Sequence, residues 1–303
     1  MVAGHAAARR LRDAAAAEPP PRVSADRRRR RRPSVGGAVG LAVLALLVAV
    51  ALLGPLLPLA DPDRQDLLGR LAPPLGFGGD ADHPLGTDGL GRDLLARLVA
   101  GARVSLLVGV TATLVAGMIG VGFGLVAGAL GGAVDRIVTW VVDVVLAVPF
   151  VVFAVAASAV LEPGLGTVIL VLAATGWVGY ARVVRLQARA LRAAPYVEAA
   201  RALGAGRGRV LLRHLLPNLL APVIVLASQQ VAAMVLYEAA LSYLGLGVPG
   251  DTVTWGGMVA AGRETLADAW WVSTVPGIAL AVTVLGLSLL GDRLAAGQGR
   301  RRW

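Results

Sequence analysis

The chain has 303 residues, a net charge of +10, and a composition that is 56% hydrophobic, with a mean hydropathy of +0.71. A water-soluble core of this size could not bury so much apolar surface, so the composition predicts a protein that uses lipid as part of its solvent. The 29 basic residues are all arginine, and cysteine is absent. These absences exclude disulfides, thiolate metal sites, cysteine nucleophiles and the lysine of a phosphate-binding Walker A loop.

The first 34 residues are rich in alanine, proline and arginine and contain the run Arg27 to Arg32. They show no apolar periodicity, so we expect a disordered cytoplasmic tail. This tail either binds anionic lipid head groups or acts as a topology determinant, and the general charge rule for membrane proteins favours the second. The arginines are not interleaved with aromatic residues, so nucleic acid is not an expected partner.

Six apolar stretches have the length that a membrane span requires, which is roughly 20 residues for a bilayer core of about 30 Å. They run from Val35 to Leu59, Val104 to Ala129, Ile137 to Val160, Gly166 to Tyr180, Leu219 to Tyr237 and Val272 to Leu290. Within these bounds Asp143 is the only charged residue, and the fourth stretch is the shortest. The sequence therefore predicts an all-α integral membrane protein with about six transmembrane helices.

The arginines also predict an orientation, because positive charge resists translocation. With the N-terminus inside, the cytoplasmic segments hold 23 arginines and the outer segments hold 6. We therefore expect both termini to be cytoplasmic, in a multi-pass protein of the plasma or inner membrane. The predicted parts are the tail 1–34, a first helix at 35–60, an extracytoplasmic loop at 61–103, a core of five helices at 104–292 and a C-terminal tail at 293–303.

The extracytoplasmic loop contains a short amphipathic segment, Leu94 to Val99, which includes Arg97. The segment could dock a binding protein, anchor at the membrane surface or pack on a partner. Trp255, Trp270 and Trp271 are expected at the outer interface, where indole is favoured.

Glycines spaced by four residues mark one face of the second span and its inner end: Gly120, Gly124, Gly128 and Gly132. Small residues at this spacing let a neighbouring backbone approach closely, so we expect a helix-packing contact. In the third span Pro149 is expected to kink the helix. Asp143 is interpreted as one partner of an ion pair with an arginine such as Arg136, in preference to a proton relay.

The cytoplasmic loop 182–218 predicts a short helix outside the membrane. Pro195 can start it, Glu198 suits its first turn, and Gly204 can end it. Ala199 and Ala200 give it a smooth face of small residues. A helix this short is not stable alone, and such a face suits insertion into a groove on another protein.

The same residues carry a resemblance to a known family. Glu198-Ala199-Ala200, then Gly204, then Leu216-Pro217 resembles the EAA loop of ABC importer permeases, although His214 stands where the general pattern has isoleucine. The stretches His83 to Asp93, Gly101 to Gly109 and Glu238 to Gly247 resemble the oligopeptide/dipeptide/nickel branch, and within it the second, C-type permease subunit.

The resemblance implies a type I ABC importer permease fold and a subunit without catalytic or metal-binding residues. Its implied ATPase-coupling residues are Glu198, Ala199, Ala200, Gly204, Leu216 and Pro217. The implied partners are a second permease in a heterodimer, two ABC ATPases that bind ATP and magnesium, and an extracytoplasmic substrate-binding protein. No cofactor is expected in this chain, and the implied cargo is a di- or oligopeptide, a nickel complex, glutathione or a related small solute.

Two other function classes make different demands on the sequence. A secondary transporter or channel should show inverted repeats and paired intramembrane charges. A membrane-embedded enzyme should show convergent polar side chains within its spans. The spans as bounded above show neither of these features. The sequence also does not identify the cargo or the residues that line its path.

Overall fold

The computed structural model describes residues 35–249 and 252–298, and these residues are helical apart from loops and two isolated β-bridges. The predicted tail 1–34, including Arg27 to Arg32, lies outside the described residues, as do 299–303 of the C-terminal tail. Residues 293–298 of that tail belong to the last helix.

Five helical segments in the described residues are long and apolar enough to cross a membrane: Gly36–Leu56, Leu94–Leu130, Leu165–Arg192, Arg207–Tyr243 and Trp271–Gly297. The helices within them are α2 (Val35–Leu53), α3 (Leu94–Leu130), α6 (Leu165–Arg192), α9 (Leu216–Tyr243) and α11 (Trp271–Gln298). A bent pair, α4 (Gly132–Ala147) with α5 (Phe150–Val160), brings the possible number of spans to six. The all-α membrane fold predicted from the sequence is confirmed.

The third predicted span is broken. The axes of α4 and α5 differ by 87°, and Pro149, the N-cap of α5, lies in the break. Proline has no amide hydrogen and disfavours helical geometry in the residue before it, and Val148 is accordingly extended. The kink predicted at Pro149 is therefore a complete interruption of the helix.

Several helices extend beyond the predicted spans. The fourth span was predicted as the shortest, yet α6 continues as helix to Arg192. The amphipathic segment Leu94 to Val99 is not a separate helix, since it forms the first turns of α3. Helix α9 continues to Tyr243 and so includes Glu238. Hydropathy falls where a helix leaves the lipid, but its backbone hydrogen bonds continue beyond that point.

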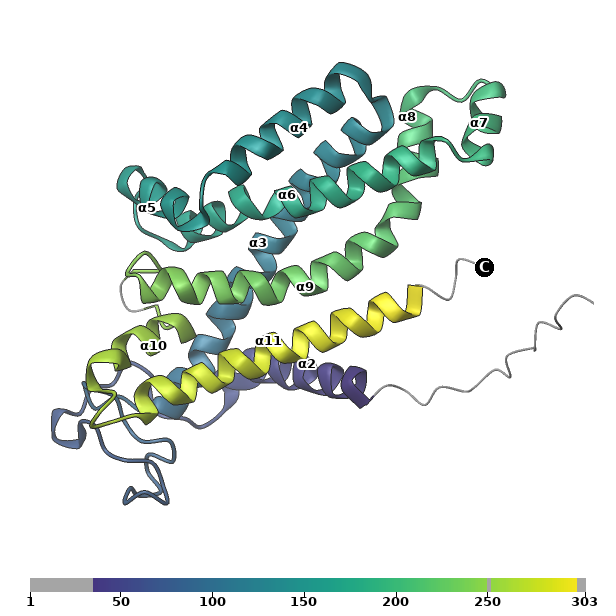
Figure 1. Cartoon of the computed structure of the whole chain (residues 1–303). Coiled ribbons are helices and arrows are strands. Elements are labelled where there is room, and N and C mark those ends of the chain that lie inside the picture. The colour runs from purple at the N-terminus through teal and green to yellow at the C-terminus, as the bar shows by residue number, and fades with distance from the viewer. Residues whose placement is uncertain (1–34, 250–251, 299–303) are drawn as a thin grey trace, which may run out of the picture. The chain divides into compact units, whose positions relative to one another are not determined.

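Three groups of buried side chains hold the helices together. One lies mainly between α3, α6 and α9, and a second joins α2, α3, α9, α11 and the short helix α10 (Trp255–Gly262). The third surrounds the short helices after α6. Figure 1 shows that α2 begins and α11 ends near the end of the bundle that carries α7 (Pro195–Ala202).

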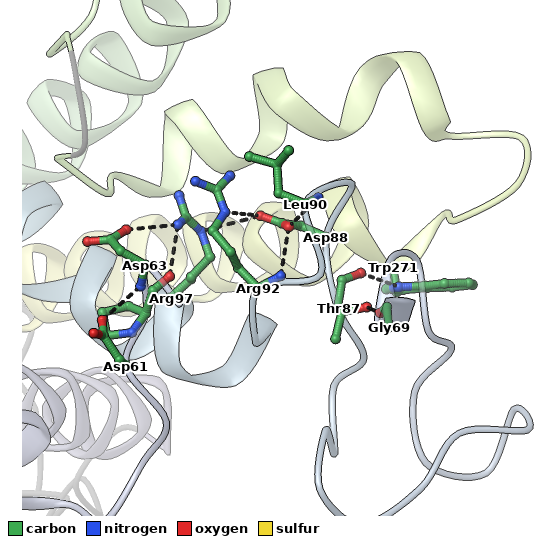
Figure 2. Close-up of polar contacts among 10 residues, drawn as sticks. Asp61, Asp63, Gly69, Thr87, Asp88, Leu90, Arg92, Arg97 and Trp271 are labelled. Atoms are coloured by element: carbon green, nitrogen blue, oxygen red, sulfur yellow. Dashed lines mark hydrogen bonds and ion pairs between the residues drawn. The ribbon is translucent and has the colours of Figure 1, made fainter. Parts of the chain in front are cut away.

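The opposite end of the bundle carries an ordered segment, residues 57–93, which we call the cap (Figure 1). Asp88 organises it: Oδ1 accepts hydrogen bonds from the amides of Leu90 and Arg92 at 2.9 and 3.0 Å. Oδ2 lies 2.7 Å from the Arg92 Nε and 3.6 Å from the Arg97 Nε. Figure 2 shows these contacts and the second contact of Arg97, with Asp63 at 3.2 Å. The cap is therefore fixed to the start of α3.

Two of the tryptophans predicted at the outer interface are buried within the subunit. Trp255 is 2% exposed, and its Nε1 donates to the Leu98 carbonyl at 2.8 Å. Trp271 is 7% exposed and donates to the Thr87 carbonyl in the cap (Figure 2). Trp270 remains partly exposed, at 40%. Trp255 and Trp271 thus act as core residues whose indole hydrogens are satisfied by backbone carbonyls.

We expect Asp88→Ala to lower the stability of the cap by about 3 kcal/mol, because it leaves two largely buried guanidinium groups without their shared carboxylate. Arg92 and Arg97 have side chains only 18% and 11% exposed. Limited proteolysis of the purified protein should show faster cleavage within residues 57–93. The exposed Asp82→Ala in the same segment is the control, and equal cleavage of both variants would contradict the prediction.

Candidate functional site

Helix α7 begins as the sequence predicts. Ala194 is its extended N-cap, and Pro195 occupies the first turn, where a missing amide hydrogen costs no hydrogen bond. Glu198 also lies in the first turn, where a negative charge is favoured by the helix dipole. Only Ala193 and Ala194 separate α7 from the end of α6.

The end of α7 depends on Gly204, which has a φ of +86°. Its amide donates to the Arg201 carbonyl at 2.9 Å, and the amide of Ala205 donates to the Ala200 carbonyl at 3.0 Å. This pair of hydrogen bonds is the Schellman arrangement, which satisfies the last carbonyls of a helix and requires a left-handed residue at this point. Glycine adopts that conformation without the strain of a Cβ atom.

Two side chains anchor α7 to the rest of the protein: Val197, and Tyr196, whose ring lies 6.4 Å from the ring of His214 and whose hydroxyl lies 3.5 Å from the Asn218 Nδ2. Val197 is fully buried and belongs to a cluster formed with Leu125, Val184, Ala188, Val210, Leu215 and Leu219. The remaining side chains of α7 are exposed or half-buried, and Leu203 just after it is 89% exposed. The helix therefore presents Glu198, Ala199 and Leu203 outward.

Leu216 and Pro217 lie where the chain turns back into α9. They follow a π-helical turn, η3 (Val210–Leu215), which itself follows the one-turn helix α8 (Arg207–Arg209). Pro217 cannot donate to a carbonyl of the preceding turn, which is consistent with the wider local geometry. The Asn218 side chain closes the turn by donating to the His214 carbonyl at 2.7 Å.

Three of the four spaced glycines lie where α3 and α6 make their closest approach. A Cβ atom at Gly124 would be 2.6 Å from the Ala181 carbonyl oxygen, and a Cβ at Gly120 or Gly128 would meet the Trp177 or Arg185 carbonyl. Gly132 is not part of this face. It has a φ of +59°, begins α4 after the chain has turned, and has open space beside it.

Two ion pairs join α4 to α6. Arg185 contacts both carboxylate oxygens of Asp135, with an Nη2 to Oδ2 distance of 3.0 Å, and the two side chains are 23% and 18% exposed. Asp143 pairs with Arg182, not with Arg136 as expected, at a distance of 3.7 Å between Oδ1 and Nη2. Both members of this second pair are more than half exposed.

Helix α9 extends beyond the predicted bound at Tyr237 and therefore includes the charged residue Glu238. Glu238 is fully buried, and its Oε1 accepts a hydrogen bond from the Ser242 hydroxyl at 2.7 Å. Its Oε2 lies 3.5 Å from the hydroxyl of Ser105 on α3, which accepts a hydrogen bond from the Trp255 amide. This carboxylate network links α3, α9 and α10. In the sequence, only Ser242, four residues after Glu238, indicated a nearby partner for this carboxylate.

A cavity of about 380 Å³ lies against the α4–α5 break and the middle of α6 and α9. Its polar lining includes Thr175, Arg182, Gln230 and Tyr237. The Tyr237 ring contacts the ring of Phe150, with centroids 4.8 Å apart. The break in the third span therefore creates a partly polar hollow within the membrane-spanning helices.

The structure is thus a set of membrane helices with an exposed, capped helix at one end and an ordered cap at the other. Residues 120–303 match the family described as the binding-protein-dependent transport system inner membrane component. Residues 26–74 match the N-terminal transmembrane domain of oligopeptide transport permease C. The chain belongs to the family of binding-protein-dependent transport permeases. It is a transmembrane permease subunit of an ATP-driven importer, not an enzyme.

Curated relatives span most of the chain. It is 38% identical over 250 residues to the probable D,D-dipeptide transport system permease protein DdpC of Escherichia coli (strain K12), covering 82% of each chain. It is 39% identical over 256 residues to the dipeptide transport system permease protein DppC of Bacillus subtilis (strain 168), covering 84% of this chain and 78% of the relative. With the Pseudomonas aeruginosa (strain UCBPP-PA14) di/tripeptide permease DppC it shares 38% identity over 260 residues, covering 86% of each chain.

The fold also has a solved counterpart. A chain of the MetNI methionine ABC transporter, in an inward-facing conformation, matches with a TM-score of 0.55 and 22% sequence identity. The match covers 66% of this chain and 95% of that chain. The structure thus has the type I ABC importer permease fold that the EAA-like loop implies. The family match does not favour the alternative of a secondary transporter or channel.

Proposed function

We propose that this chain is the second, C-type permease of a di- or oligopeptide importer. The curated relatives with the matching length are permeases of dipeptide, di/tripeptide and D,D-dipeptide systems, which supports peptides as the cargo. In this proposal a second permease completes the translocation path in a heterodimer. An extracytoplasmic binding protein delivers the peptide, and this chain contains no cofactor.

The single observation that carries the mechanism is the construction of α7. It is held by Val197 and Tyr196 and closed by the Gly204 turn, and it leaves Glu198, Ala199 and Leu203 available. We propose that this helix inserts into a groove on one of two cytoplasmic ATPases, which bind ATP and magnesium. Ala200 would extend the small-residue face, and Leu216 and Pro217 would fix the return of the chain into α9.

The proposed topology places α7 and both termini in the cytoplasm. The excess of arginine in these segments supports it, and so do the positions of the start of α2 and the end of α11, which lie at the same end of the bundle as α7 in Figure 1. The coupling loop 182–218 then contains the end of α6, α7, α8 and η3. The proposed membrane-spanning parts are the first helix and the five helices of the core at 104–292, and most of the cap lies in the proposed extracytoplasmic loop 61–103.

The test is Leu203→Asp in a complex co-expressed with the partner permease, the ATPases and the binding protein. Leu203 is 89% exposed, so the variant should insert and melt like the wild type while losing co-purification with the ATPases and ATP-dependent dipeptide uptake. Leu68→Asp is the matched control, because Leu68 is 99% exposed but lies in the cap. Undiminished ATPase co-purification with Leu203→Asp would refute the proposed role of α7, and absence of ATP-dependent peptide uptake in the wild type would refute the cargo.

A further inference from the structure

The Asp143–Arg182 pair differs from the neighbouring pair on the same two helices. Arg185 holds Asp135 through two nitrogens with both side chains mostly covered, whereas Arg182 and Asp143 approach only to 3.7 Å and are 56% and 62% exposed. An ion pair with this geometry and exposure contributes little to stability. The Asp135–Arg185 pair therefore has a structural role. The Asp143–Arg182 pair leaves most of the hydrogen-bonding capacity of its groups unused.

Each member of the loose pair lines a different cavity. Arg182 lines the 380 Å³ cavity at the α4–α5 break, together with Gln230 and Tyr237. Asp143 lines a second cavity of about 410 Å³ that includes Thr139 and Trp140. Charged side chains within membrane-spanning helices face protein or a water-filled cavity, because exposure to lipid is costly. Both charged groups therefore line hollows of this subunit, where water and solutes can reach them.

A free peptide carries a carboxylate at one end and an ammonium group at the other, and an arginine beside an aspartate complements both. We propose that Asp143 and Arg182 form a transient binding site on the translocation path for the charged ends of a peptide. Arg182 binds the carboxylate and Asp143 the ammonium group, while Gln230 and Tyr237 offer hydrogen bonds to the peptide amides. This inference rests on the proposed peptide cargo.

The weak contact between Asp143 and Arg182 is suited to transient binding on a translocation path. A group on a conducting path must bind well enough to admit its ligand and weakly enough to release it. A tightly closed pair such as Asp135–Arg185 would have to lose two short contacts before a ligand could bind, whereas the Asp143–Arg182 pair can exchange its partner for a peptide end at small cost.

Uptake of a free dipeptide by the reconstituted complex tests the site. Loss of a hydrogen bond to a charged ligand group should slow uptake by Arg182→Gln or Asp143→Asn about tenfold. The double variant Asp143→Asn/Arg182→Gln should be at least as slow as either single variant. If the pair were only structural, removing both charges would leave no unpaired group, and uptake would return toward the wild-type rate. The control Arg185→Gln should instead lower the melting temperature.

A second measurement locates the peptide directly. The chain has no cysteine, and a Cβ at Gly179, which lines the first cavity, would meet open space. During turnover, dipeptide should slow the reaction of a small thiol reagent with Gly179→Cys at least severalfold, and it should not protect Asp82→Cys, whose position is exposed in the cap. Wild-type uptake with neither protection nor a loss in the charge variants would overturn this site and leave the proposed function intact. Absence of wild-type uptake would overturn the proposed function itself.

Discussion

Gly124→Leu is expected to prevent assembly of the native helix bundle. Even the first carbon of a side chain at this position would lie 2.6 Å from the Ala181 carbonyl oxygen and 2.9 Å from the Val184 Cβ. Helix α6 would have to move away from α3, which would open the buried contact between them. We expect a loss of stability of about 3 kcal/mol or more, observed as a lower melting temperature and a lower yield of monodisperse protein in detergent.

The control lies two residues away on the same helix. Gly122 is exposed, and a Cβ atom there would meet no atom within 4 Å. Gly122→Leu therefore makes the same change in helix propensity and hydrophobicity without a steric conflict inside the subunit. If both variants lost the same yield and melting temperature, close approach of α3 and α6 would not be the reason for glycine at position 124.

Glu238→Ala is expected to destabilise the junction of α3, α9 and α10. The change leaves a cavity and removes the acceptor of the Ser242 hydroxyl, all within a fully buried region. We expect a loss of about 2–3 kcal/mol, combining cavity formation with an unsatisfied polar group. Thermal unfolding of the purified subunit measures it.

Glu238→Gln separates the shape of the side chain from its charge. It fills nearly the same volume and retains one oxygen that can accept from Ser242, so it should lose less stability than the alanine variant. A Glu238→Ala protein that melts at the wild-type temperature would show that the network makes no net contribution to stability.

The sequence predicted the positions of the membrane helices well, because long apolar stretches have few alternatives to helices in lipid. It predicted their ends poorly. Helix α6 continues past Tyr180 to Arg192, and α9 continues past Tyr237 to Tyr243. A charged residue shows where a chain can meet water, whereas a helix ends where its hydrogen bonds are capped, and these are separate events.

The local geometry of α7 was also predictable, since Pro195 and Gly204 act within a few residues of chain. The Glu238 network was not, because its members are hydroxyl groups of α3 and α9 and the backbone amide at the start of α10. The pairing of Asp143 with Arg182 likewise depends on how α4 crosses α6, and the nearer Arg136 misled the sequence argument. Contacts that depend on helix packing can be predicted only once the three-dimensional arrangement of the helices is known.

Helix α6 is long and uninterrupted, so it can transmit a movement along the subunit. Its 28 residues span about 42 Å as one uninterrupted helix. It holds α3 along the glycine face, carries Arg182 and Arg185, and ends two residues before α7. A displacement imposed on α7 can therefore reach Arg182 through a two-residue link and continuous helix, while Asp143 lies on the shorter helix α4, which ends just before the break at Pro149. Relative movement of α6 and α4 would open or close the gap between Arg182 and Asp143.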